Sequence, residues 1–423
     1  MKELVGLLVS GLVAYIVARW LVPTQAGANA DRGVSGRFRA EWGIWLSSGV
    51  AAILLGILLG PLVSGTFSRS IIEDLSPLEE MLAGWVGWLI GLQMNWDNLR
   101  RIETKTILWT GGEVLVASTL VTGAVALAML VWLGRVFWPA AVIFGALAGV
   151  SSPMIVALSA PRARSDPFLR RLFVHTSLAP AFSVLILGTV LACLPLGRGR
   201  WGAFGAWFWI LMGPAVGLLL GGLFHFLTLY RIRDKDLLVV MLGFVALGSG
   251  AARVMGLSPL LVTMLAGMVV AGRSPQRRRL FVSLQRAEKP FFLFLLVVAG
   301  SLWLPLSGVG PWVAVLAAFW GRGVAKTATG LVLYVWCDGR RGARSAFPLA
   351  LVGHGGVVVA MAVTVHDAMG GTVGQMMLTY ALIGVLLSPG LVPFLRDAVR
   401  SEEQGDRIRD GAGQDVPIQS RRS

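Results

Sequence analysis

A chain of 423 residues with 56% hydrophobic and only 14% charged residues is too apolar for a soluble domain, in which about a quarter of the residues carry charge. The net charge of +15 does not point to a nucleic-acid partner, because Lys and Arg gather in short segments between apolar runs. The composition therefore predicts a polytopic protein of the lipid bilayer.

Apolar segments long enough to cross a bilayer core of about 30 Å follow one another along the chain. We expect helices at 3–22, 42–64, 80–96, 106–134, 138–160, 170–194, 201–228, 236–252, 257–272, 290–305, 308–336, 345–365 and 375–395. The first segment has no small-residue cleavage site, so we expect it to remain as a span. The pattern predicts an all-α protein of about thirteen transmembrane helices.

The loops that join these segments alternate between many and few positive residues, and positive loops stay on the cytoplasmic side. The alternation predicts an outer amino terminus and a cytoplasmic carboxyl terminus in the inner (plasma) membrane, with Arg278 and Arg341 inside and Arg69 outside. Residues 1–396 form the expected membrane transporter domain. Residues 397–423 are polar and mixed in charge, which predicts a disordered cytoplasmic tail.

Two predicted helices contain helix-breaking residues near their middles. Ser151, Ser152 and Pro153 interrupt the fifth, "GALAGVSSPMIVALSA", and Gly353 and Gly355 interrupt the twelfth, "LVGHGGVVVAMAV". Unwound backbone at membrane depth is tolerated only where it lines protein or a water-filled cavity. The breaks lie seven helices apart, an odd number, so the two halves have opposite orientations. This pattern is typical of secondary transporters with inverted repeats, whose ion sites lie where two broken helices cross.

Several motifs, in order, resemble the sodium/proton antiporters of the monovalent cation:proton antiporter superfamily. They are "GILLGPLVSG", "WLIGLQMNWDNLRR", "FGALAGVSSPMIVALSA", "GLSPLLVTMLAGMVVAG", "RAEKPFFLFLLVVAGSLWLP" and "WGRGVAKTATG". The resemblance covers most of the chain from Trp42 to Phe394. It implies the antiporter fold, exchange of Na⁺ or K⁺ for H⁺, and a homodimer formed by a scaffold half. It also implies that Lys326 is the family's membrane-embedded lysine.

The sixth helix departs from the family. There the family keeps an acidic pair that binds the cation and the proton in competition, and alignment on "SLAPAFSVL" places that pair at Pro180 and Ala181. Both carboxylates are absent. The departure leads us to expect weak or altered coupling between cation and proton.

Few residues could take over from the missing acids. Glu113 lies within the fourth predicted helix, so it is a candidate proton carrier or one half of a structural ion pair. His354 is a second candidate carrier or an interhelical hydrogen-bonding group, and His175 is a weaker one. Arg322 and Lys326 share a helix face, and we expect Arg322 to be structural. Lys326 must pair with Glu113, bind carbonyls of an unwound helix, bind an anion or lose its proton.

The resulting ion pathway comprises Ser151, Ser152, Pro153, Pro180, Ala181, Lys326, Gly353, His354 and Gly355. Two other functions stay open. The positive groups at the crossing would suit an anion-binding transporter at half-helix amino ends, and a degenerate antiporter would suit a non-transporting sensor or partner subunit.

Other chemistries find no support. The sequence has no Cys–His metal spacing, no Walker-type loop and no nucleophile elbow. We therefore expect no enzyme activity, metal or cofactor, and small inorganic ions as the substrates.

Overall fold

The computed structural model describes the helical body of the chain. The described residues are 49–67, 71, 74–94, 100, 102–153, 156–157, 167–194, 205–229, 234–274, 277–338, 346–395 and 397. Within these ranges the chain forms helices and no β-strand, which confirms the all-α prediction. The first predicted span at 3–22, the loop positions Arg69 and Arg341, and the tail beyond residue 397 lie outside the described residues.

The helices follow the predicted apolar segments. In chain order they are α3 (Val50–Leu59), α5 (Ser76–Gln93), α7 (Thr104–Leu133), α8 (Trp138–Ala148), α10 (Pro167–Cys193), α11 (Ala206–Leu229), α12 (Asp234–Val254), α13 (Pro259–Arg273), α14 (Arg277–Leu302), α15 (Val309–Asp338), α16 (Ala346–Val352), α17 (Gly356–Met369), α18 (Gly371–Leu387) and the 3-10 turn η3 (Ser388–Gly390). Every predicted span from residue 42 onward contains a described helix. The count of thirteen stays a prediction, since the first span is not among them.

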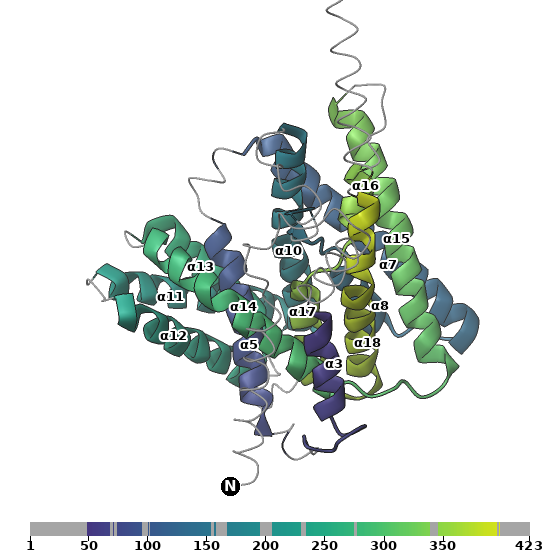
Figure 1. The fold of residues 1–423 in the computed structure, drawn as a ribbon, viewed down its shortest axis with the longest axis horizontal. Helices are drawn as coiled ribbons and strands as arrows, with labels where there is room; N and C mark the ends of the chain where they lie inside the picture. Colours follow the sequence, from purple (N-terminus) through teal and green to yellow (C-terminus); the bar gives the residue numbers. More distant parts are fainter. Residues whose placement is uncertain are drawn as a thin grey trace, which may run out of the picture.

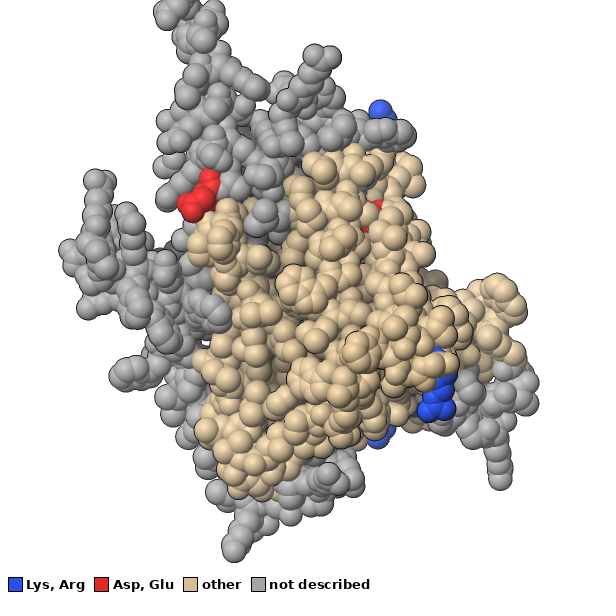
Figure 2. Space-filling view, turned by 90° about the vertical axis from the view of Figure 1, so that its right-hand side faces the viewer, with Lys and Arg blue, Asp and Glu red and all other residues tan. Residues whose placement is uncertain are grey.

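Membrane-spanning length and an apolar surface occur together. Six helices of the described part are long and apolar enough to cross a membrane, among them the 30-residue α7. Large apolar side chains such as Leu127, Trp132, Trp320 and Val324 are exposed on α7 and α15. Figure 2 shows this side of the molecule, where the middle of the face carries no Lys, Arg, Asp or Glu. An uncharged, apolar outer face is what a lipid environment requires.

The helices can be divided into two groups, with α11, α12 and α13 on one side of the molecule and α7 and α15 on the other (Figure 1). We call α3, α5, α11, α12, α13 and α14 the scaffold group, and α7, α8, α10, α15, α16, α17 and α18 the core group. Glycines bring the scaffold helices into backbone contact: a methyl group on Gly91 of α5 would lie 2.1 Å from the carbonyl oxygen of Met264 of α13. Gly217 and Gly221 of α11 meet α13 in the same way, at 2.8 and 2.7 Å from its carbonyl oxygens. Their four-residue spacing therefore serves helix packing.

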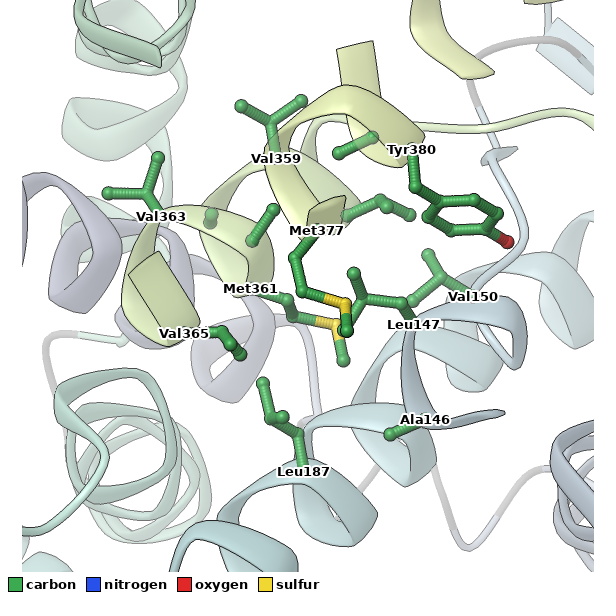
Figure 3. Packing of buried hydrophobic residues seen from close by; sticks show 14 of the residues in the cluster. Ala146, Leu147, Val150, Leu187, Val359, Met361, Val363, Val365, Met377 and Tyr380 are labelled. Atoms are coloured by element: carbon green, nitrogen blue, oxygen red, sulfur yellow. The ribbon is translucent and has the colours of Figure 1, made fainter. Parts of the chain in front are cut away.

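An apolar cluster surrounds the interrupted helices of the core group (Figure 3). Met361 of α17, Met377 of α18, Leu147 of α8 and Leu187 of α10 are fully buried in it. Side chains on four helices thus hold the half-helices in place, because a close-packed interior leaves little room for shifts.

Candidate functional site

The two interrupted helices cross. α8 ends at Ala148, and residues 353–355 separate α16 from α17. The Ser151 hydroxyl donates to the carbonyl of Leu351 at 3.1 Å, across 200 residues of sequence. A methyl group on Gly355 would lie 3.1 Å from Ser152 Oγ, so these two positions are in contact. The crossing predicted from the spacing of the two breaks is confirmed.

Arg322 of α15 binds the carbonyl oxygens at both breaks. Its Nε donates to Ala148 at 3.1 Å and its Nη2 to Val150 at 2.6 Å, on the α8 side. On the other side it donates to Val352 and, at 3.2 Å, to Gly353. The last carbonyls of a helix have no partner within the helix and carry partial negative charge. A guanidinium that is 1% exposed satisfies them here, which agrees with the expected structural role of Arg322.

Lys326, one turn further along α15, forms a buried ion pair with Glu113 of α7. Its Nζ lies 3.0 Å from Glu113 Oε1. The same ammonium donates to the carbonyl of Gly149 at 2.6 Å and to Ser151 Oγ at 3.1 Å. Lys326 is 0% and Glu113 2% exposed. Of the alternatives for Lys326, the structure shows two at once: the pair with Glu113 and the bond to an unwound carbonyl.

Two further groups reach the Glu113 carboxylate. His175 Nε2 lies 3.6 Å from Oε2, and its Nδ1 is 2.9 Å from Thr110 Oγ1. Thr329 Oγ1 lies 3.4 Å from Oε1. His175 was expected to be a weaker candidate than Glu113 or His354, because its approach to Glu113 depends on the packing of α10 against α7.

Helix α10 carries no carboxylate at Pro180 or Ala181. It remains helical through Pro180, and Ala181 is buried in the apolar cluster. Because proline has no N–H, the carbonyl of Thr176 loses its partner in the helix. Ser183 is fully buried, its hydroxyl has no hydrogen-bond partner among the described residues, and it lies 2.6 Å from the position of a methyl group on Gly149.

His354 is held in one orientation. Its Nδ1 lies 3.1 Å from Arg322 Nη1 and must accept, which leaves the ring proton on Nε2. Its backbone N–H donates to Ser388 Oγ at 2.8 Å, and its ring stacks on Phe319 at 6.2 Å. A second proton on Nδ1 would face the guanidinium. This geometry favours a hydrogen-bonding role for His354 over proton carriage.

A cavity of about 200 Å³ lies between the core and scaffold groups. The core group lines it with residues of both breaks and with Pro180, and the scaffold group with residues of α5 and α14. Of the predicted pathway residues it reaches Ser151, Ser152, Pro153, Pro180, His354 and Gly355. Lys326, Glu113, Ala181 and Gly353 lie outside its lining.

The lining includes Glu288, an acid that the sequence analysis missed. The segment 277–289 is rich in charge and was expected to be a loop before a helix at 290–305. That boundary was wrong, because α14 begins at Arg277 and carries Glu288 within the helix. An apolar-length criterion overlooks a helix whose first half is rich in charged residues.

The cavity lies toward one end of the helix bundle. Gln93 is the last residue of α5, Ser177 lies in the first half of α10, and Glu288 lies in the first half of α14. The loop charges predict that these helix ends are cytoplasmic.

No group of three or more His, Cys, Asp or Glu side chains that could hold a metal ion occurs among the described residues.

Comparison with known proteins agrees with this geometry. The profile of a family described as "Sodium/hydrogen exchanger, transmembrane" matches residues 34–396. Among solved structures, the chain is similar to the sodium proton antiporter MjNhaP1 from Methanocaldococcus jannaschii at pH 8, with a TM-score of 0.61 and 15% identity. That match covers 94% of this chain and 98% of the other. No curated protein sequence matches. The predicted antiporter fold in a multi-pass membrane protein is confirmed.

Proposed function

Because the chain belongs to the sodium/hydrogen exchanger family, we propose that it exchanges Na⁺ or K⁺ for H⁺ across the inner membrane, with weak or altered coupling. The observation that carries this proposal is the cavity, which reaches both crossed breaks and is lined by Ser151, Ser152 and unwound backbone. Hydroxyl and carbonyl oxygens are ligands that suit hard cations. We further propose the predicted orientation, with the amino terminus outside, and a homodimer formed by the scaffold group.

The charges around the cavity support a cation as substrate. Its described lining contains the acid Glu288 and neither Lys nor Arg. The two positive groups of the crossing, Arg322 and Lys326, are buried and already bonded to carbonyls or to Glu113. An anion entering this cavity would meet no free positive side chain of the described lining.

The chemistry of α10 supports weak or altered coupling. A carboxylate holds either a cation or a proton, and this competition links the two flows. Helix α10 has no carboxylate at Pro180 or Ala181, and the Ser151 and Ser152 hydroxyls that line the cavity can bind a cation but take up no proton at ordinary pH. Cation binding at such oxygens would release no proton.

Glu113 is then the acid through which proton movement would be coupled to cation movement. When a proton neutralises its carboxylate, Lys326 loses its counter-ion and its hold on the α8 break changes, because the same ammonium binds Gly149 and Ser151. Proton binding at Glu113 would in this way alter the backbone that contacts the ion.

The test uses purified protein in liposomes with an internal pH dye, pulsed with Na⁺, K⁺ and Li⁺ and then with anions. We expect slow cation-dependent proton movement and no response to anions. Glu113→Gln should abolish it, whereas Glu103→Gln, an exposed acid just before α7, should not. Ala181→Asp should raise the flux several-fold by restoring a carboxylate at one of the two positions that align with the acidic pair of the family, and Ala181→Asn serves as its uncharged control.

Three outcomes would contradict the proposal. Fast exchange like that of relatives with the acidic pair would refute the altered coupling. Anion flux that is lost in Lys326→Met but kept in Glu113→Gln would indicate an anion transporter. No proton flux with any of the ions would indicate a sensor or partner subunit.

A further inference from the structure

Glu288 lies close to the break between α16 and α17. It precedes Phe292 by four residues in α14, so the two side chains share one face of that helix. A methyl group on Gly356 would lie 1.5 Å from the Phe292 ring, which shows that Phe292 packs directly on the first residue of α17. Glu288 is therefore about one helical turn, 5 Å, from that contact. Its side chain is exposed and lines the cavity that reaches the crossing.

The negative charge of Glu288 has no partner among the described residues. None of the ion pairs that the structure gives for them includes it, and His354 is the other titratable side chain of the described lining. Lys289 follows directly in the helix, but adjacent helical residues do not face each other. By contrast, Glu113 is paired with Lys326, is buried and does not line the cavity.

We propose that Glu288 gathers the transported monovalent cation into this cavity and sets the affinity with which the cation is loaded from that side. The inference rests on the proposed function. A carboxylate in a cleft with low-dielectric walls raises the local concentration of cations. Glu288 belongs to the scaffold group, and no hydrogen bond within the described part of the chain joins its side chain to the breaks. It should therefore govern the loading of the cation, whereas the crossing should set the maximal rate.

The experiment compares wild type with Glu288→Gln in proteoliposomes, varying the cation on the side that the cavity faces. One unit charge a few ångströms from a cation in water corresponds to about a fivefold difference in affinity. We expect Glu288→Gln to raise KM about fivefold, with the maximal rate changed by less than about twofold. Glu288→Asp should keep a KM near that of wild type, and Glu103→Gln should leave both parameters unchanged.

Moving the charge separates an electrostatic role from a structural one. Ser177 of α10, in the core group, lines the same cavity. The double variant Glu288→Gln with Ser177→Glu should therefore recover a low KM. Stabilisation of the purified protein by Na⁺, K⁺ or Li⁺, measured as a shift in Tm, gives a readout that does not require transport, and it should follow the same order of variants.

The outcomes distinguish this inference from the proposed function. If wild type transports or binds a cation and Glu288→Gln does so with unchanged affinity, the role of Glu288 is refuted and the proposed function stands. A lower maximal rate at unchanged KM would refute it as well. If wild type neither transports nor is stabilised by any cation, the proposed function fails and this inference fails with it.

Discussion

The crossing of the core group and the contacts of the scaffold group both bring backbone close to backbone, but through different chemistry. In the scaffold group, Gly91 lets α5 approach α13 to a distance at which a methyl group would overlap Met264. Both α5 and α13 run without interruption at this contact. At the crossing, the helices stop, and Arg322 and Lys326 bind the carbonyls that the breaks leave free. Small residues suffice where helices are intact, whereas broken helices need buried positive charge.

The largest expected effect is that of removing the guanidinium. Arg322→Met leaves carbonyls of both breaks without donors, each at a cost of about 1–3 kcal/mol, so we expect a loss of about 4 kcal/mol or more in the free energy of unfolding. Thermal unfolding in detergent measures it, and the exposed Arg135→Met is the control. If Arg322→Met had the same Tm as the control, Arg322 would not stabilise the two breaks.

The next effect concerns the ion pair. Lys326→Met leaves the Glu113 carboxylate buried without a counter-ion, and we expect a loss of about 3–5 kcal/mol. The double variant Lys326→Met with Glu113→Leu should recover much of it, because an apolar pair of similar volume removes the uncompensated charge. Additive losses in this double-mutant cycle would show that the two residues do not act as a pair.

A smaller effect is expected in the scaffold group. Gly91→Ala should lower stability by about 1–3 kcal/mol, because the added methyl group must push α5 and α13 apart. It should leave the cation KM unchanged. Gly123→Ala in α7 is the matched control, since nothing lies within 4 Å of the added methyl group. An unchanged Tm in Gly91→Ala would mean that the helices separate without cost.

The smallest effect is expected at the crossing itself. Ser151→Ala removes the hydroxyl that donates to Leu351, a loss of about 1 kcal/mol for a buried hydrogen bond. Because Ser151 also lines the cavity, cation affinity should fall more than stability does. Equal changes in stability and in KM for Ser151→Ala and Ser183→Ala would remove the distinction between cavity-lining and sealed hydroxyls.

The sequence predicted the site unevenly. It identified both breaks and the isolation of Glu113, because these depend on residue type and local helix periodicity, and the resemblance to the antiporter family identified the absence of acids at Pro180 and Ala181. It missed Glu288, whose helix begins with the charged residues from Arg277 onward. It also underrated His175, which approaches Glu113 from another helix.

Apolar length and helix-breaking residues, read from the sequence alone, determined an all-helical membrane protein with two breaks in inverted halves. These are local properties, since a helix satisfies its own backbone in lipid and a break does not. Only the tertiary structure decided which partner Lys326 takes, which carbonyls Arg322 binds, and which acid faces the cavity. Each depends on contacts between residues far apart in the chain, such as the 213 positions that separate Glu113 from Lys326. No local pattern encodes the packing that brings such residues together.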